Sequence, residues 1–213
     1  MSSKSAVRGG KPADLSLIET MRWEPSVGFV RLPQHLRRLH RSADALGFLP
    51  APADLVKQIE SLGQGDVPLR VRLEMTYRGK IVLTAVPFEP VRPDVTWRLR
   101  LAEARIASDD PIYRHKTCRR DVYEAARREY PSAEVDEVVL LNERDEVCEG
   151  TITNIFVEDE SDMLLTPPLS SGLLPGVLRG ELIREGKARS SLLRKQDLVG
   201  RVIYVGNSLR GLI

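Results

Sequence analysis

With 213 residues, the chain is long enough to bury a substantial core as one large domain or two small ones. Its 42% hydrophobic and 29% charged residues are ordinary for a globular protein, and 32 Lys and Arg against 30 Asp and Glu leave a net charge of only +2. That balance gives no reason to expect a nucleic-acid or membrane partner. The two cysteines and three histidines are spread along the chain without the spacing of a metal site.

The chain begins MSSKSAVRGGKPADLS, which has two lysines and a glycine pair but no apolar stretch of signal-peptide length. No apolar run approaches the roughly 18 residues that a membrane-spanning helix needs. We therefore expect a cytoplasmic protein with a loose N-terminus.

The first half of the chain predicts two helices followed by strands. Apolar side chains recur at the three- and four-residue spacing of an amphipathic helix at Leu32, Leu36, Leu39, Ala43 and Leu46, just before Gly47. A shorter helix is expected over residues 54–62, and apolar and polar residues alternate over 69–76 as in a half-buried strand. Residues 80–86 then complete a hairpin, and 96–101 alternate as a further strand.

The polar stretch 107–111 marks our predicted boundary between two subdomains, residues 1–106 and 107–213. Beyond it, the pattern predicts in chain order a helix over 119–130, a strand over 138–141, a hairpin of 153–157 and 163–166, a helix over 176–187 and a strand over 202–205. This order predicts an α+β protein with a cleft between its subdomains.

Lys116 is the first candidate for chemistry, because residues 113–120 surround it with three arginines and a histidine. Nearby positive charges disfavour an ammonium group, so they lower the pKa of a lysine, as a Schiff-base lysine needs. The same composition is also typical of a solvated basic patch, or of a phosphate or nucleic-acid contact.

Three further blocks could carry chemistry. Glu149 precedes Gly150 and an apolar strand, although a glutamate in such a place is commonly a turn residue. Residues 170–179 bring a glycine into the start of a helix, where backbone N–H groups can bind phosphate. Residues 206–211, Gly-Asn-Ser-Leu-Arg-Gly, put polar side chains after a strand, which is also the composition of a plain turn.

In their order and spacing these four blocks resemble the class IV aminotransferase family. This is the pyridoxal-phosphate fold type IV that includes branched-chain aminotransferases, D-amino acid aminotransferases and aminodeoxychorismate lyases. Residues 18–22, IETMR, and 34–39, QHLRRL, also resemble the family's early strand and first helix. The resemblance thus extends from about residue 18 to the C-terminus, and it implies an active site between the two subdomains.

The resemblance implies a role for each matching residue. Lys116 would hold pyridoxal 5'-phosphate as a Schiff base and shuttle protons, Glu149 would pair with the pyridine nitrogen, and Arg38 would bind the phosphate. The other expected phosphate contacts are the N–H groups of Val177 and Leu178 and the polar groups of Asn207 and Ser208. Arg120 and Arg210 are candidate binders of substrate carboxylates. No metal is expected.

Some features depart from the family pattern. The usual opening, an Asn-Gly turn followed by Asp-Arg-Gly and Tyr-Gly-Asp-Gly stretches, is absent, so we expect a shortened first subdomain. Arg119, Arg120 and Asp121 follow the lysine where many relatives have Asn and Tyr or Arg. Leu178 stands where several aminotransferases have a threonine.

Residues 206–211 are more similar to aminodeoxychorismate lyases than to branched-chain aminotransferases. Our first hypothesis is therefore a lyase of folate biosynthesis that converts 4-amino-4-deoxychorismate to 4-aminobenzoate and pyruvate. One alternative is a class IV aminotransferase for branched-chain or D-amino acids. Another is a non-catalytic cofactor- or nucleic-acid-binding protein. Relatives are homodimers, so the resemblance also implies a homodimer.

Overall fold

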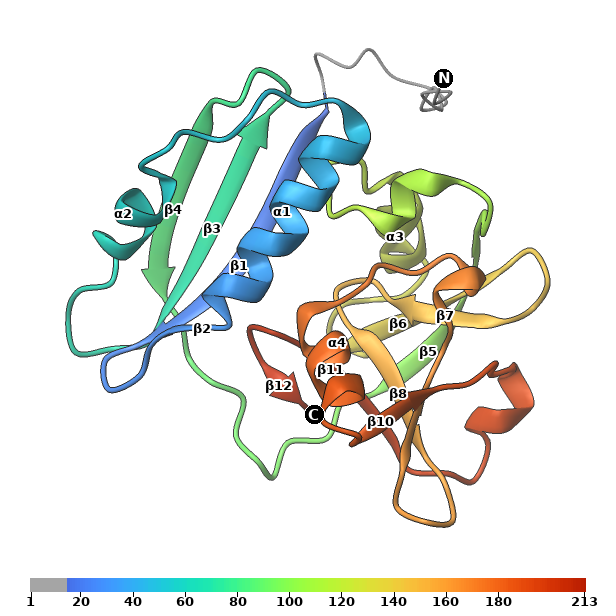
Figure 1. Ribbon diagram of the computed structural model, residues 1–213. Coiled ribbons are helices and arrows are strands. Elements are labelled where there is room, and N and C mark those ends of the chain that lie inside the picture. The colour runs from blue at the N-terminus through green and yellow to red at the C-terminus, as the bar shows by residue number, and fades with distance from the viewer. Residues whose placement is uncertain (1–14) are drawn as a thin grey trace.

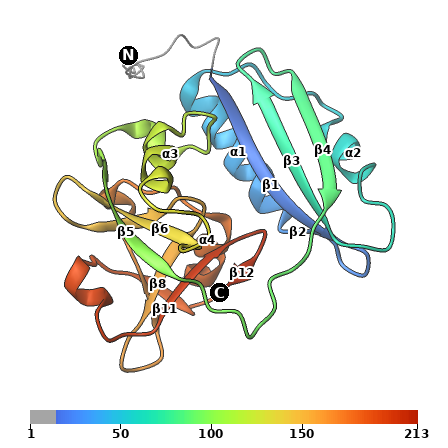
Figure 2. The same ribbon diagram turned by 180° about the vertical axis from the view of Figure 1, so that it is seen from behind.

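The computed structural model describes residues 15–213, so the expected loose N-terminus lies, up to residue 14, outside the described residues. The described chain forms two β-sheets with helices packed against them (Figure 1). The predicted α+β class is confirmed. Seen from behind in Figure 2, the segment between β4 and β5 runs from the first half of the molecule to the second.

The first sheet has the strand order β2-β1-β3-β4, and every neighbouring pair is antiparallel. Its strands are β1 Ser16–Glu24, β2 Gly28–Val30, β3 Leu69–Thr76 and β4 Ile81–Pro87. β3 alternates as predicted, because Val71, Leu73 and Met75 are buried while Arg70 and Arg72 are exposed. Successive side chains of a strand point to opposite faces, so this sheet has one apolar face and one polar face that carries Arg70 and Arg72.

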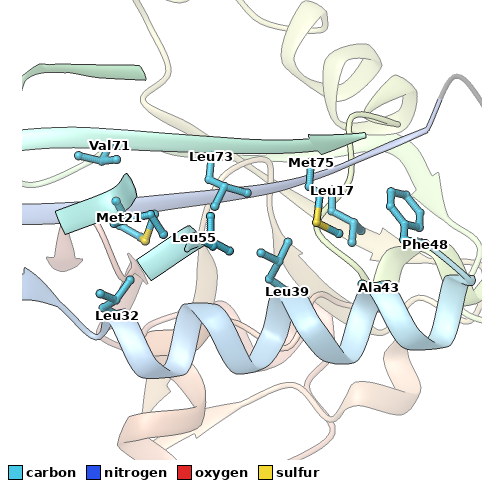
Figure 3. Close-up of a cluster of buried hydrophobic side chains, with 11 residues drawn as sticks. Leu17, Met21, Leu32, Leu39, Ala43, Phe48, Leu55, Val71, Leu73 and Met75 are labelled. Carbon is cyan, nitrogen blue, oxygen red and sulfur yellow. The ribbon is translucent and has the colours of Figure 1, made fainter. Parts of the chain in front are cut away.

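Helix α1 (Leu32–Leu46) and the short α2 (Leu55–Glu60) cover the apolar face. Figure 3 shows the apolar side chains of α1, β1 and β3 meeting between helix and sheet. Both ends of α1 agree with the prediction, because Pro33 suits a first helical turn and Gly47 takes the left-handed φ of 73° that ends a helix. Helix α2 is shorter than the expected 54–62.

The second sheet has the order β10-β9-β8-β7-β6-β5, with β11 beside β8 and β12 beside β11. β5 and β6 are parallel, as are β9 and β10, and the other pairs are antiparallel. The strands are β5 Leu99–Ile106, β6 Glu137–Asn142, β7 Val147–Gly150, β8 Asn154–Glu158, β9 Leu164–Thr166, β10 Ala188–Ser190, β11 Ile203–Asn207 and β12 Gly211–Leu212.

Helices α3 (Asp121–Arg128) and α4 (Val177–Arg184) belong to the second half and are shorter than predicted. α3 begins two residues after the expected start, at Asp121, and residues 116–118 before it pair with β1. α4 ends before Gly186, which takes a left-handed φ of 69°. Short 3-10 turns cover Pro111–Arg114, Leu169–Ser171 and Lys195–Leu198. None of the helices within residues 15–213 has the length and hydropathy needed to cross a bilayer.

By sheet membership the chain divides between β4 and β5, whereas we expected a boundary after residue 106. β5 lies on the second side because it pairs in parallel with β6. Alternation predicts that a segment is a strand, but it does not say which sheet the strand joins. After β5 the chain returns to the first sheet, where the Ile18 N–H donates to the Lys116 carbonyl at 2.8 Å. The two sheets therefore meet around Lys116.

Candidate active site

A cavity of about 440 Å³ lies where the two sheets meet, a size typical of small-molecule sites. Its walls come from β1, α1, β3 and β4 on one side, and from residues 112–123, β7, β8, the start of α4 and residues 207–210 on the other. Except for Leu178, every site residue predicted from the sequence lines this cavity, namely Arg38, Lys116, Arg120, Glu149, Val177, Asn207, Ser208 and Arg210.

Lys116 is held at the cavity wall by backbone pairing with β1. Its carbonyl accepts from Ile18, and Thr117 forms a bridge with Leu17. Burial, and next the positive charge of Arg38, lower the pKa of Lys116 from the ordinary 10.5 to about 8. We expected the lowering to come from the arginines of its own segment, but burial has the larger effect and Arg38 belongs to α1. With this pKa about one-fifth of the amine is neutral at pH 7.4, far more than for a lysine with the ordinary pKa.

Glu149 lies in β7, so the structure places it in a strand and not in a turn. Its Oε1 accepts hydrogen bonds from the Tyr123 hydroxyl at 2.7 Å and the Leu174 N–H at 3.1 Å, and neither bond uses Oε2. Burial raises the pKa of Glu149 to about 7, although Tyr123 and Leu174 oppose the rise. A cationic group facing this carboxylate would lower the pKa again and keep it ionised.

Glu137 was missed by the sequence analysis, although it supports the turn after Glu149. Its buried carboxylate accepts hydrogen bonds from the Thr151 N–H and hydroxyl, the Ile152 N–H and the Thr153 hydroxyl. These bonds fix residues 151–153, which connect β7 to β8. No local sequence pattern indicates a role for Glu137, because these donors belong to residues 151–153, far along the chain from its own position in β6.

Arg38 reaches the cavity from α1 and is paired with Glu19 of β1. Its guanidinium donates to both carboxylate oxygens at 2.8 and 2.6 Å, and more weakly to the Pro175 carbonyl at 3.4 Å. His35 contacts the same carboxylate at 2.6 Å. Burial alone would raise the pKa of Glu19, but Arg38 and His35 hold it at about 2. The segments IETMR and QHLRRL, noted only as resembling the family, thus meet at one ionic cluster.

The start of α4 borders the cavity close to Arg38, which contacts the Pro175 carbonyl. Gly176 precedes the helix at a point where a Cβ would come within 1.8 Å of the Asn154 amide oxygen. Val177 lines the cavity, whereas the Leu178 side chain packs into the core against Phe156. The phosphate contact predicted for Leu178 uses its backbone N–H, so the burial of its side chain does not conflict with the prediction.

Asn207 ends β11 and Ser208 follows it, and the two side chains are used differently. Asn207 Oδ1 accepts from the N–H groups of Leu209 and Arg210, and its amide donates to the Ile152 carbonyl at 3.0 Å. Asn207 therefore holds its own turn in place. The hydroxyl of Ser208 lies 2.8 Å from Nε2 of His35.

Arginines gather around the rest of the cavity. Arg120 donates to the Thr151 carbonyl at 2.6 Å and lies over the Tyr123 ring, with 4.9 Å from guanidinium carbon to ring centre. Arg210 lies over the Trp97 ring at 5.9 Å. Arg119, which pairs with Asp110, also lines the cavity. Arg70 and Arg72 reach it from the polar face of β3. The alternation of β3 showed which face carries them, but not that this face is turned towards the site.

These groups fit pyridoxal phosphate by their chemistry. An imine with the cofactor aldehyde needs an amine of lowered pKa, which Lys116 supplies. The protonated pyridine nitrogen needs a buried carboxylate, which Glu149 supplies. The phosphate needs cationic and N–H donors, which Arg38 and the start of α4 supply.

The comparisons with known proteins agree with this site. The family model "Amino-transferase class IV" matches residues 16–213. The crystal structure of a "Putative amino-acid aminotransferase" from Mesorhizobium loti is 46% identical, with a TM-score of 0.90, and the match covers 94% of this chain and 98% of that one.

Two curated relatives carry names of different activities. The "Putative aminodeoxychorismate lyase" of Schizosaccharomyces pombe is 27% identical over 186 residues, covering 84% of this chain and 80% of the relative. The "Probable branched-chain-amino-acid aminotransferase" of Thermotoga maritima is 27% identical over 179 residues, covering 81% and 64%. The family match spans both sheets and all of the cavity walls, and the chain therefore belongs to the class IV aminotransferases, a family of enzymes that use pyridoxal phosphate.

Proposed function

We propose that this chain is a pyridoxal-phosphate-dependent 4-amino-4-deoxychorismate lyase. The observation that carries the proposal is a group of four arginines in the cavity lining, beside Arg38 and Arg119: Arg70, Arg72, Arg120 and Arg210. The substrate bears two carboxylates, and arginine binds a carboxylate through paired hydrogen bonds. The likeness of residues 206–211 to lyases and the name of the S. pombe relative support the same choice.

In this proposal each part of the cofactor has its own partner. Lys116 attaches it covalently through Nζ, and Glu149 faces the pyridine nitrogen. Arg38 and Ser208, with the N–H groups of Val177 and Leu178, hold the phosphate. Asn207 acts by fixing the turn that presents Ser208. When bound, the pyridoxal ring accepts the electron pair released at the substrate carbon.

The lyase step then depends on the Lys116 amine, which the amino group of the substrate would displace from the cofactor. Its nitrogen takes the proton from the amine-bearing ring carbon, and the neighbouring ring carbon–oxygen bond breaks to release enolpyruvate. A proton converts enolpyruvate to pyruvate, and the ring becomes the aromatic 4-aminobenzoate. The pKa of about 8 suits this role, because such an amine both accepts and returns a proton near neutral pH.

The first experiment tests the covalent attachment. Purified protein is mixed with pyridoxal phosphate, reduced with borohydride, digested and analysed by mass spectrometry. We expect reduced cofactor on Lys116 of the wild type, none attached to Lys116→Ala, and normal attachment to Lys57→Ala, which changes an exposed lysine of α2. Cofactor attached to a different residue would overturn the proposal.

The second experiment tests the reaction itself. With 4-amino-4-deoxychorismate as substrate, we expect 4-aminobenzoate and pyruvate in equal amounts. Arg210→Gln should raise the KM about tenfold, the cost of one charged hydrogen bond, while Arg37→Gln, outside the cavity on α1, should not change it. If product forms only from pairs of amino acid and 2-oxo acid, the lyase assignment is wrong.

An aminotransferase is the second candidate, favoured by the 46% identity to the M. loti structure named for that activity. In this case Lys116 would move a proton between the substrate carbon and the cofactor carbon, and the arginines would bind the carboxylates of an amino acid. A panel of branched-chain and D-amino acids with 2-oxoglutarate, followed by amino-group transfer, separates the two candidates.

The proposal includes a homodimer in the cytoplasm that acts on a small amino substrate and not on nucleic acid. Its support is the family resemblance and the small-molecule size of the cavity. Light scattering coupled to size-exclusion chromatography gives the mass in solution, and a monomeric mass for the active enzyme would remove the dimer from the proposal.

A further inference from the structure

Glu19, His35 and Ser208 form a continuous chain of side chains at the Arg38 end of the cavity. His35 Nδ1 lies 2.6 Å from Glu19 Oε2, and His35 Nε2 lies 2.8 Å from Ser208 Oγ. The exposed fractions are 2% for Glu19, 1% for His35 and 6% for Ser208. Because the three residues come from β1, α1 and the turn after β11, the contact joins the two halves of the molecule.

The protonation of Glu19 decides which nitrogen of His35 carries a proton. Arg38 and His35 keep the carboxylate ionised, with a pKa of about 2. An ionised carboxylate can only accept a hydrogen bond, so Nδ1 of His35 must be the donor. Nε2 is then the one variable position: it carries a lone pair when His35 is neutral and a proton when His35 is charged.

The state of Nε2 in turn decides what Ser208 offers to the cavity. Beside neutral His35, the Ser208 hydroxyl donates its proton to Nε2 and turns only oxygen lone pairs to a ligand. Beside charged His35, Nε2–H donates to Oγ, and the hydroxyl proton can point into the cavity. The Ser208 carbonyl also accepts a long hydrogen bond of 3.5 Å from Arg31, which is itself paired with Glu181 at 2.7 Å.

We propose that His35 is a positioning residue, and that an anionic group binding beside Ser208 and Arg38 enters together with a proton on His35. The inference rests on the proposed function in one respect, since it takes this anion to be the cofactor phosphate. The bound state then has a Ser208 hydroxyl that donates to phosphate and an imidazolium that offsets part of its charge.

The charges around His35 set the direction of the effect. Burial, with the charges of Arg38 and Lys116, lowers the pKa of His35 below 6.5, and Glu19 opposes this. His35 is therefore neutral above pH 7 when no anion is bound. A phosphate raises the pKa of His35, so binding takes up a proton and the affinity falls as pH rises, by at most about tenfold per unit.

The test uses pyridoxamine 5'-phosphate and pyridoxamine, which lack the aldehyde and so cannot react with Lys116. Calorimetry at pH 8 in two buffers of different ionisation enthalpy gives the protons taken up. At this pH a free phosphate monoester, with a second pKa of about 6, is already a dianion. We expect a phosphate-linked uptake of about one proton, that is, about one proton more for pyridoxamine 5'-phosphate than for pyridoxamine. Lys116 and Glu149 also titrate near this pH, and pyridoxamine, which meets both groups, supplies the baseline for them.

Variants assign the proton to its residue. His35→Gln keeps a hydrogen-bonding side chain but cannot titrate, so the uptake should disappear and the affinity should depend less on pH. His40→Gln changes an exposed histidine of the same helix and should leave the uptake unchanged. Ser208→Ala should weaken binding of pyridoxamine 5'-phosphate more than binding of pyridoxamine.

Equal uptake for both ligands, or full uptake by His35→Gln, would overturn the inference. The ligand comparison needs only the wild-type protein, so it stands even if His35→Gln does not fold. Covalent attachment of pyridoxal phosphate to Lys116 without proton uptake by His35 would leave the proposed function intact. If neither pyridoxal phosphate nor pyridoxamine 5'-phosphate binds, both the inference and the proposed function fail.

Discussion

Tyr123 donates a 2.7 Å hydrogen bond from helix α3 to Oε1 of Glu149 in β7. Burial, and next the charge of Glu149, raise the pKa of Tyr123 well above 10, so the hydroxyl stays protonated and remains a donor. The bond favours the ionised form of a carboxylate whose pKa burial has raised to about 7. A helix side chain thus helps to keep the proposed partner of the pyridine nitrogen charged.

Removing this hydroxyl should weaken cofactor binding at neutral pH. In Tyr123→Phe the pKa of Glu149 rises above about 7, so at pH 7 a larger fraction is neutral and less suited to a pyridinium. We expect about a tenfold loss of pyridoxal-phosphate affinity at pH 7, partly recovered by pH 9. Absorbance titrations across this range measure it. Tyr77→Phe, which removes a hydroxyl outside the cavity and keeps the ring packed on Phe48, should behave as the wild type.

The rate of covalent attachment should follow the pKa of Lys116. Only the neutral amine attacks an aldehyde, so at saturating pyridoxal phosphate the rate should rise about tenfold per pH unit below pH 8 and level off above it. Stopped-flow absorbance between pH 6 and 10 gives the profile. A rate that continues to rise to pH 10, as an ordinary lysine would give, would show that burial does not activate this amine.

The elements that local signals define were predictable from the sequence. Helix α1 was predicted at both ends, because its apolar spacing and Gly47 are features of a short stretch of chain. The assignment of β5 to a sheet was not predictable, since its partner β6 begins more than 30 residues later. Pairing between distant strands depends on tertiary contacts that alternation does not encode.

In the candidate site, too, local signals were predictive and tertiary contacts were not visible in the sequence. Lys116 and Glu149 were found because each lies in a block whose order resembles a family. Glu19, His35 and Glu137 were given no role, because each acts through groups contributed by other elements. A buried carboxylate in a sequence does not reveal its donors, and these three residues became visible only through the hydrogen bonds that the fold brings together.

Glu137 should be needed for both stability and the shape of the site. In Glu137→Gln an amide NH₂ would face the donors of Thr151 or Thr153, so some of the hydrogen bonds are lost and buried donors are left without a partner. We expect a loss of about 2–4 kcal/mol in the free energy of unfolding. Denaturant titration measures it. The control Asp136→Asn weakens a solvent-exposed ion pair with Arg98, while the amide oxygen can still accept from the Arg98 N–H, so it should cost about 0–1 kcal/mol. Equal losses for both would mean that the buried carboxylate does not stabilise the turn.

Two glycines of the α4 region should respond in opposite ways to alanine. In Gly176→Ala the new Cβ would come within 1.8 Å of Asn154 Oδ1, and Asn154 also donates to the Leu174 carbonyl. The helix start must therefore shift, which we expect to cost about 1–3 kcal/mol and to weaken binding of pyridoxamine 5'-phosphate. In Gly180→Ala the nearest atom is the flexible end of Arg184 at 3.4 Å, so alanine should stabilise the helix by about 0.5–1 kcal/mol. Thermal and denaturant unfolding of both variants checks the pair, and a stabilised Gly176→Ala would show that the start of α4 tolerates movement.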